Sequence, residues 1–408
     1  MAKLKTSPPH TAPQAGLAFI LHGHAPYVRQ AGRSAAGEEP LHGLIADSYA
    51  PMLTGLYDLV DRGTNVRVGL ALSPLLLDQL ADPVVQKHTV QSLEQAISLA
   101  DQRVRESQER RDEHGAYLAQ FYAQFHRRNL HIFERQWGRN LVTATRSLAE
   151  AGVIEILGQT ATHIVPQLHD RVIVRAQLEI GLINIMRNLG QRPTILWAAD
   201  DPLTPELLEL LPPLGIRGVV APPNPGQPLT TSYWLDQARQ TWGLSADPRL
   251  LNHIASTSLG YPGDLLYRAS ATAPLGDGTL TRSGAPYDPF HAYARARLHA
   301  RHFVALAEEM ASATPADAAP GPLVVASDLE LFGSGWFEGG LWLRTVIEEL
   351  HKSTALRLQL PSALIERHPP TTVLATAEPS QAHDPVLADA FRQLQAVVEQ
   401  YPRTYGDR

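Results

Sequence analysis

The apolar run Leu17-Ala18-Phe19-Ile20-Leu21 is followed directly by His22-Gly23-His24. The run is continuous rather than alternating, which is typical of a strand that is buried on both faces of a sheet. Side chains two positions apart on an extended strand point the same way, so we expect both imidazoles to face one pocket. This stretch predicts an α/β fold with polar groups at the carboxyl ends of its strands.

Five further apolar runs end in polar clusters in the same way. They are residues 66–72, 153–157, 194–197, 218–220 and 323–326. Helical patterns lie between them, and the pattern of residues 170–188 is closed by a glycine and a proline. Alternation of strand and helix predicts a parallel α/β sheet, either a barrel or a doubly wound sheet, with its site at the carboxyl ends of the strands.

Residues 82–151 interrupt this alternation, because they are charged, helical in pattern and without a strand signal. They form either a helical insertion or two long crossover helices. We expect residues 1–15 to be a disordered tail and residues 16–310 to form the barrel with this insertion. Residues 311–368 then hold the last barrel strand and the start of a C-terminal helical region, and residues 369–408 form a polar linker and a terminal helix.

Composition narrows the functional classes. The 408 residues have a formal net charge of −6, which argues against nucleic acid as a partner because phosphate binding needs clustered Lys and Arg. There is no cysteine, which excludes disulfides and thiolate chemistry and fits a cytoplasmic location. No apolar stretch reaches the length of a signal peptide or a membrane span. The oligomeric state is left open.

Carboxylates follow two of the apolar runs. Asp200 and Asp201 follow the fourth run, and Asp328 and Glu330 follow a late one. Acidic groups at the ends of two different strands are what a nucleophile and an acid/base pair require. Taken alone, such a carboxylate is more often a solvated loop residue or a helix cap, and Asp201 before Pro202 fits a cap.

The histidines and aromatic residues beside these clusters can have either a functional or a purely structural role. His22 and His24 could bind sugar hydroxyls or a metal, or be satisfied by the backbone, and two histidines are too few to assign a metal. Aromatic rings suit the apolar C–H face of a sugar, although core packing is the commoner role for any single ring. The rings concerned are Tyr27, Trp197, Tyr261, Tyr267 and Trp336.

Four motifs in this order resemble those of glycoside hydrolase family 57, and within it most closely the 1,4-α-glucan branching enzymes. They are HGHAPYVR at residues 22–29, ATHIVP at 161–166, GYPGD with a nearby Tyr-Arg at 260–268, and DLELFG with WFEG at 328–339. The resemblance extends from Leu17 to about Pro361.

This resemblance implies an incomplete (β/α)7 barrel of the TIM type with a helical insertion and a short helical C-terminal region. It implies a retaining reaction on α-1,4-glucans or maltooligosaccharides, with no cofactor and no metal. Asp200 falls at the position of the nucleophile, and Asp328 falls at that of the acid/base. The residues expected to bind substrate are His22, His24, His163, Trp197, Tyr261, Arg268 and Trp336.

The sequence also departs from the family pattern. The motif Trp-Leu-Pro-Glu-Cys reads Trp-Ala-Ala-Asp-Asp at residues 197–201, so Asp200 replaces a glutamate with a side chain one methylene shorter. A carboxylate set back by about 1 Å costs on the order of 10²-fold in rate. Ser334-Gly335 stands where the family has a histidine and an aromatic residue, and the Gly-Ser-Trp-Gly stretch and the Trp-rich helical segment are not found after Pro361.

Three functional readings therefore stay open. The first is an active α-glucan hydrolase or branching transferase that uses Asp200 and Asp328. The second is a catalytically impaired homologue that binds glucans. The third is a metal-dependent hydrolase like the polysaccharide deacetylases, which draws on His22, His24, His163 and the Asp200-Asp201 pair.

Overall fold

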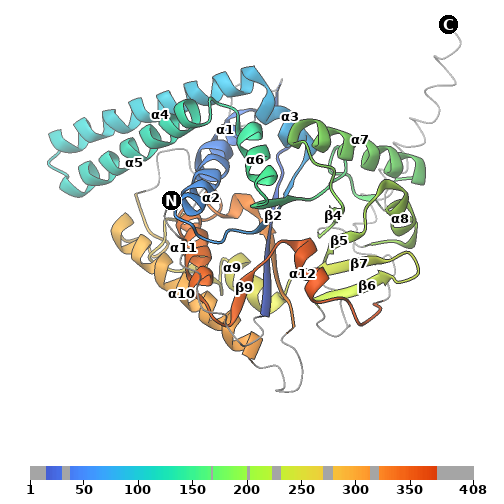
Figure 1. Cartoon of the computed structure of the whole chain (residues 1–408). Coiled ribbons are helices and arrows are strands. Elements are labelled where there is room, and N and C mark those ends of the chain that lie inside the picture. Colours follow the sequence, from blue (N-terminus) through green and yellow to red (C-terminus); the bar gives the residue numbers. More distant parts are fainter. Residues whose placement is uncertain are drawn as a thin grey trace, which may run out of the picture.

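The computed structural model describes residues 15–29, 37–166, 169–199, 203–222, 231–269, 279–312 and 321–374, and Figure 1 shows their arrangement. The strands are β1 (Ala15–Gly23), β2 (Val68–Leu72), β3 (Ile154–Ile156), β4 (Ile195–Trp197), β5 (Gly218–Ala221), β6 (Ser232–Asp236), β7 (Thr241–Ser245), β8 (Leu323–Asp328) and β9 (Leu356–Leu358).

The α-helices are α1 (Glu39–Leu44), α2 (Ala50–Asp61), α3 (Pro74–Ala81), α4 (Pro83–Glu109), α5 (Glu113–His131), α6 (Leu141–Glu150), α7 (Arg171–Leu189), α8 (Pro205–Leu210), α9 (Pro248–Ala255), α10 (Pro289–Ser312), α11 (Gly339–Lys352) and α12 (Pro361–Arg367). Shorter turns of helix are η1 (Ile45–Tyr49), η2 (Ile132–Gln136), η4 (Pro212–Leu214), η5 (Tyr261–Gly263) and η6 (Leu329–Leu331).

Seven of the described strands follow one another around a barrel. The first sheet has the order β3-β2-β1-β8, and β4-β5-β7 continue in a second sheet. Gly158, just after β3, joins the two sheets because it donates to the carbonyl of Ile195 at 2.7 Å and accepts from the amide of Trp197 at 2.8 Å. On the other side, the amide of Asp247 donates to the carbonyl of Val324 at 2.8 Å. Two hydrogen bonds at Gly158 and one at Asp247, rather than full ladders, link the two sheets. The predicted incomplete (β/α)7 fold is confirmed.

The barrel interior is filled by alternate side chains of the strands. On β1, Ala18 and Ile20 belong to the inner cluster, whereas Leu17 and Phe19 pack outward in the larger core. This division follows from the two-residue period of a strand. Leu364 of α12 also belongs to the inner cluster. The same parity directs His22 and Asp328 inward, at the carboxyl ends of their strands.

The strands β6, β7 and β9 were not predicted, and β6 corrects the expectation of a wholly parallel sheet. β6 pairs with β7 in antiparallel register, and β9 pairs with the start of β1. β6 is largely half-buried and β9 has three residues, so neither gives the long, continuous apolar run of a strand buried on both faces.

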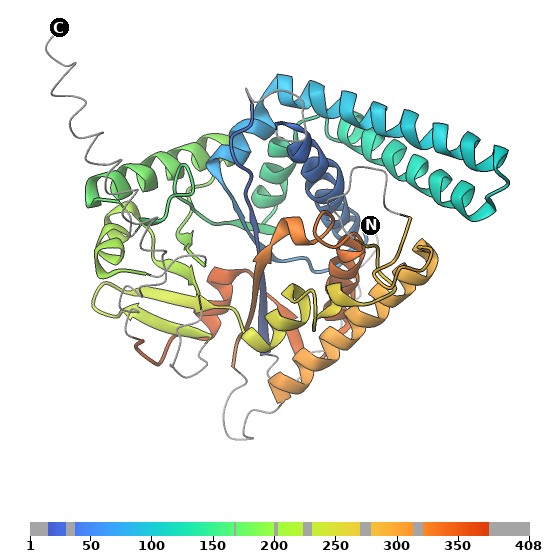
Figure 2. The same cartoon turned by 180° about the vertical axis from the view of Figure 1, so that it is seen from behind.

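Helices occupy most of the span between β2 and β3. Asp82 caps α4 by accepting from the amide of Val84 at 2.7 Å. Figures 1 and 2 show α4 and α5 side by side as a long pair that extends away from the barrel, with α6 packed closer to it. The helical pattern is thus present, and its status as a separate insertion stays a prediction.

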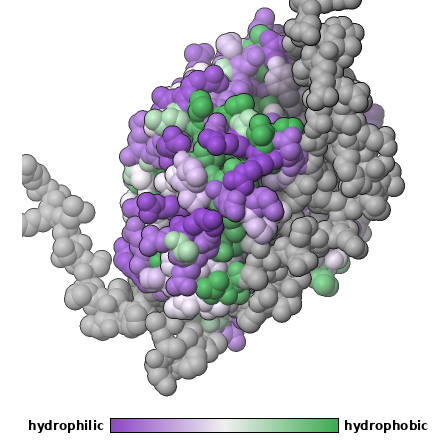
Figure 3. Space-filling model, turned by 90° about the vertical axis from the view of Figure 1, so that its right-hand side faces the viewer, coloured by the Kyte–Doolittle hydropathy of each residue, from purple (hydrophilic) through white to green (hydrophobic). Residues whose placement is uncertain are grey.

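The face that carries α7 and α8 mixes hydrophobic with hydrophilic side chains (Figure 3). α7 exposes four apolar residues there, Val172, Ile180, Ile183 and Met186. None of the described helices combines the length and the apolar character that crossing a bilayer requires. The predicted N-terminal tail, but for Ala15, and the linker and terminal helix beyond Leu374 lie outside the described residues.

Candidate active site

The parallel pairing of β1 with β8 places His22 beside Asp328. His22 and Asp328 are paired positions in this parallel ladder, and His22 Nδ1 lies 3.0 Å from Asp328 Oδ1. When the carboxyl group of Asp328 is ionised it can only accept, and Nδ1 is then the donor. The His22 side chain is 5% exposed and that of Asp328 is 66% exposed. The buried ring therefore orients a carboxyl group that remains open to solvent.

Aromatic rings from three strand ends stack beside this pair. The ring of His22 lies 4.7 Å from that of Trp197 with an interplanar angle of 10°, and 5.3 Å from that of His163. The rings of His24 and His163 are 4.3 Å apart. The structure thus brings His22, His24, His163, Trp197 and Asp328 together, as the sequence predicts.

Close packing of α7 positions the segment that carries His163. A side chain on Gly181 would place its Cβ 2.1 Å from the carbonyl oxygen of Gln159, so glycine allows the helix to approach this segment. Gln177 then accepts from the amide of Ala161 at 2.9 Å with its carbonyl and from the amide of Thr162 at 2.9 Å with its side chain. His163 itself adopts a left-handed backbone conformation with φ of +53°.

Glu330 is a buried neighbour of this group. Its Oε1 accepts from the Tyr49 hydroxyl at 2.5 Å and from the backbone amide of His24 at 2.9 Å. Burial raises the pKa of the Glu330 carboxyl, and burial together with Glu330 raises the pKa of Tyr49 well above its usual value. The sequence marked Glu330 as a strand-end carboxylate, whereas Tyr49 lies in a helical stretch that gives no signal of a site.

Further contacts hold the loops around the site in place. His24 Nδ1 lies 3.0 Å from the hydroxyl of Ser73, which also caps α3. In the turn after Glu330, Gly333 has φ of +139° and approaches η1 so closely that a Cβ would lie 2.0 Å from the carbonyl oxygen of Asp47. The amide of Ser334 donates to the Ser48 hydroxyl at 3.0 Å. The turn that follows Asp328 is therefore fastened to η1.

Three predicted substrate-binding residues lie elsewhere. Tyr261 is buried, with its hydroxyl 2.8 Å from His302 Nδ1. Trp336 is buried against Trp342, with ring centroids 5.6 Å apart. The guanidinium of Arg268 lies 4.1 Å from the centre of the Phe337 ring. Rings enclosed in this way present no face to a sugar in this conformation.

Asp200, the predicted nucleophile, and Asp201 lie outside the described residues. Within the described ranges, three metal-type donor atoms come within 4.8 Å of one another at Glu38, His42 and His88, and not at the site. The site histidines instead oppose one another with their ring faces. The metal-dependent reading also draws on Asp200 and Asp201, which lie outside the described residues, so it stays a prediction.

Comparison with known proteins places this constellation in a family. Residues 18–224 match the model of glycosyl hydrolase family 57. This chain belongs to glycosyl hydrolase family 57. The matched segment holds β1 from residue 18 onward and β2 to β5. It includes four residues whose rings stack on one another and are called the stacked wall below: His22, His24, His163 and Trp197.

Two similar proteins are named as 1,4-α-glucan branching enzymes. A 1,4-α-glucan branching enzyme of Thermococcus kodakarensis is 26% identical over 383 residues, which cover 82% of this chain and 55% of that protein. A probable 1,4-α-glucan branching enzyme of Mycobacterium tuberculosis is 26% identical over 354 residues, which cover 81% and 67% of the two chains. The chain thus spans little more than half the length of the first of these relatives.

Solved structures agree on the fold. A family 57 branching enzyme from Pyrococcus horikoshii superposes with a TM-score of 0.82 at 25% identity, and the match covers 97% of this chain and 80% of that one. An α-amylase from Thermotoga maritima superposes with a TM-score of 0.79 at 22% identity, and the match covers 97% and 83% of the two chains.

Proposed function

We propose that this chain is a retaining enzyme of α-1,4-glucans, which transfers the cleaved glucan to water or, in branching, to a hydroxyl of a second glucan chain. The observation that carries the proposal is the exposed carboxyl group of Asp328, held by the buried His22 beside the stacked wall of aromatic rings. Membership of family 57 and the named branching enzymes among the relatives support it.

In the first step, Asp328 in its acid form donates a proton to the glycosidic oxygen, and the bond from the anomeric carbon to that oxygen breaks. The carboxylate of Asp200 attacks the anomeric carbon on the opposite face and forms a glycosyl ester. The assignment of Asp200 rests on its sequence position after β4.

In the second step, Asp328 as carboxylate takes a proton from water or from an incoming sugar hydroxyl. The freed oxygen attacks the anomeric carbon, the ester bond breaks and the carboxylate of Asp200 is released. Two displacements retain the anomeric configuration. His22 serves both steps because its bond to Oδ1 fixes the rotation of the Asp328 carboxyl group while most of that group stays accessible.

The stacked wall gives the sugar an apolar and polar surface together. His24 and His163 are half-buried and can contact a glucose unit, whereas Trp197 and His22 are buried and support them from within the stack. We propose that the natural ligand is an α-glucan of the glycogen type and that the protein acts in the cytoplasm, which its lack of cysteine fits.

The experiment is incubation of the purified protein with amylose, followed by measurement of reducing ends and of α-1,6 branch points. The control is the double variant Asp200→Ala, Asp328→Ala prepared in the same way. Turnover above that control, with products of retained anomeric configuration by NMR, supports the proposal. Wild-type turnover no greater than that of the double variant contradicts it.

A second candidate is a family 57 protein that binds glucans without cleaving them. The observation in its favour is the aspartate in place of the glutamate at position 200, together with Ser334-Gly335 in place of a histidine and an aromatic residue. Calorimetry with maltooligosaccharides separates the candidates. Binding without turnover supports the second candidate, and the absence of any heat of binding excludes it.

A further inference from the structure

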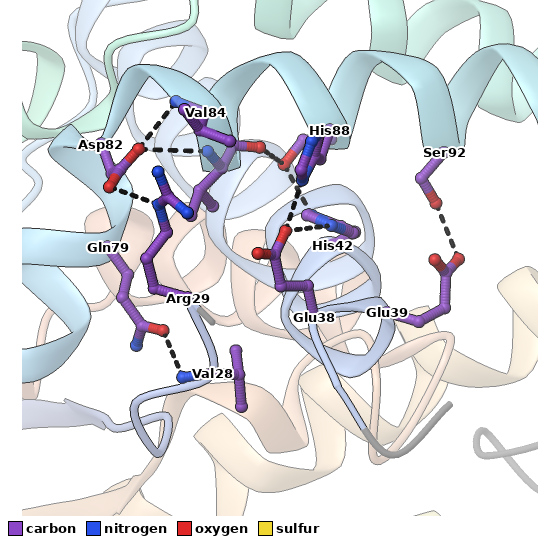
Figure 4. Close-up of polar contacts among 12 residues, drawn as sticks. Val28, Arg29, Glu38, Glu39, His42, Gln79, Asp82, Val84, His88 and Ser92 are labelled. Atoms are coloured by element: carbon purple, nitrogen blue, oxygen red, sulfur yellow. Dashed lines mark hydrogen bonds and ion pairs between the residues drawn. The ribbon is translucent and has the colours of Figure 1, made fainter. Parts of the chain in front are cut away.

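Three side chains of the type that binds metals meet between α1 and α4, away from the proposed catalytic group (Figure 4). Glu38 directly precedes α1 and His42 follows one turn later, since the amide of His42 donates to the carbonyl of Glu38 at 3.2 Å. His88 lies on α4. Their donor atoms all lie within 4.8 Å of one another. We propose that Glu38, His42 and His88 bind one divalent transition-metal ion, zinc by preference, which fastens α1 to α4.

The hydrogen bonds of His42 determine which of its nitrogens faces the proposed ion. His42 Nδ1 lies 2.9 Å from the Thr89 hydroxyl, and that hydroxyl donates its single hydrogen to the carbonyl of Val85 at 2.9 Å. Nδ1 must therefore donate to Thr89, which leaves the lone pair of the neutral ring on Nε2. Such an outer contact is typical of metal-binding histidines, because it fixes the tautomer and the ring orientation.

That lone pair points toward a second electron-rich atom. His42 Nε2 lies 3.5 Å from Glu38 Oε2, and the same oxygen lies 2.6 Å from His88 Nδ1. A positive charge makes this contact favourable, and either a proton on the imidazole or a metal ion can supply it. A metal ion bound by all three atoms would supply that charge.

Two of the three donor separations lie near the spacing required by a tetrahedral ion, and the third is within 4.8 Å. Metal–ligand bonds of about 2.0 Å at the tetrahedral angle hold the donor atoms about 3.3 Å apart. The 3.5 Å contact already has this spacing. The 2.6 Å contact has the length of a proton-mediated bond, so metal binding would displace that proton and lengthen the contact by about 0.7 Å.

Burial and ligand type point to zinc. The side chains of Glu38 and His42 are 2% and 1% exposed, whereas that of His88 is 24% exposed. Water can therefore reach the site past His88 and supply a fourth ligand. Two imidazoles and one carboxylate suit zinc and neighbouring transition metals, whereas magnesium and calcium prefer oxygen ligands alone.

The location gives the ion a structural role. α1 leads directly into η1, whose Tyr49 binds Glu330 next to the active site. On the other side of the cluster, Asp82 at the start of α4 accepts from Arg29 Nε at 2.7 Å, so the end of the first motif is held by the same helix. A metal bound here would hold α1, and with it η1, against the same helix that already binds Arg29 at the end of the first motif.

The test begins with protein stripped of metal by dialysis against a chelator and then titrated with Zn²⁺, Co²⁺ and Mg²⁺. We expect one tight site per chain for Zn²⁺ and Co²⁺, the visible absorption of tetrahedral cobalt, and no comparable binding of Mg²⁺. Zinc at about 100 times its Kd should raise the Tm by about 2–4 °C, and chelator should reverse this rise.

Variants show whether this cluster is the site. His42→Ala and His88→Ala should each weaken binding at least about 10-fold. His291→Ala is the matched control, because it removes an exposed histidine whose Nδ1 lies 2.8 Å from Asp288 Oδ2, and it should leave the affinity unchanged. If His42→Ala does not fold, the zinc affinity of His88→Asn, a variant at a more exposed position, and the cobalt spectrum of the wild type test the proposal.

The proposal is overturned by any of three results. They are the absence of stoichiometric Zn²⁺ binding to the wild type, equal affinity in the wild type and His88→Ala, and loss of the site in His291→Ala. The glucan assay is independent of these measurements, so failure here is distinguishable from failure of the proposed catalytic function.

Discussion

His22 Nδ1 and Asp328 Oδ1 lie 3.0 Å apart although 306 positions separate the two residues in the chain. They meet because β1 is hydrogen bonded to β2 on one side and to β8 on the other. In a barrel, the first strand and a late strand become neighbours, and side chains of the same parity share the interior. The catalytic proposal depends on this adjacency.

The first prediction concerns Asp328. Asp328→Asn keeps the size of the side chain and removes its ability to exchange a proton, so we expect kcat on amylose to fall by about 10²–10⁴-fold. Maltooligosaccharide binding should change little. Asp288→Asn is the matched control, because Asp288 also pairs with a histidine but directly precedes α10 and is not part of the proposed site. Equal activity of Asp328→Asn and the wild type would remove Asp328 from the reaction.

The second prediction concerns the shortened nucleophile position. Asp200→Glu adds one methylene and should advance the attacking oxygen by about 1 Å, which we expect to raise kcat by up to about 10²-fold. Asp200→Ala should lower kcat at least as much as Asp328→Asn does. Asp201→Ala is the companion variant, and a larger loss in it than in Asp200→Ala would assign the nucleophile to Asp201.

The third prediction concerns the turn after Asp328. Gly333→Ala should lower the free energy of unfolding by more than about 2 kcal/mol, because φ is +139° and the new Cβ would meet the Asp47 carbonyl. In Gly55→Ala, by contrast, the Cβ meets no atom within 4 Å on helix α2, so this control should be neutral or more stable by up to about 1 kcal/mol. Urea unfolding of both variants provides the comparison, and equal stabilities would contradict the packing argument.

The fourth prediction concerns pH. Burial raises the pKa of Asp47 from 3.8 to about 6, against the opposing effect of Arg268. The folded state therefore holds a proton that the unfolded state releases between these two values, and the contribution of Asp47 to stability falls as pH rises through this window. From pH 4.5 to 7.5 the expected loss is about 2 kcal/mol.

Asp47→Asn should remove this dependence. The difference in unfolding free energy between the wild type and the variant, measured by urea at both pH values, isolates the contribution of Asp47 from that of other groups. The variant should gain stability relative to the wild type as pH rises. A difference that is the same at both values would show that the pKa of Asp47 is not raised.

Local sequence patterns were sufficient to predict the barrel fold and part of the candidate active site. Continuous apolar runs mark strands buried on both faces, and the polar residues that end them, such as His22 and Asp328, were identified from that position alone. β6 and β9 escaped prediction because short or half-buried strands lack this signal. Tyr49 escaped because it contacts the site through the packing of helices.

The sequence by itself determined the alternation of strands and helices, the inward parity of His22 and Asp328, and the residue types available for chemistry, because these follow from periodicity along the chain. The tertiary structure decided which of these residues meet. Tyr261 and Trp336 carry the same local signal as Trp197, yet they are buried in the outer core while Trp197 stacks on His22. Glu38, His42 and His88 come together in the same way, because contact between α1 and α4 depends on how the helices pack, which no local pattern encodes.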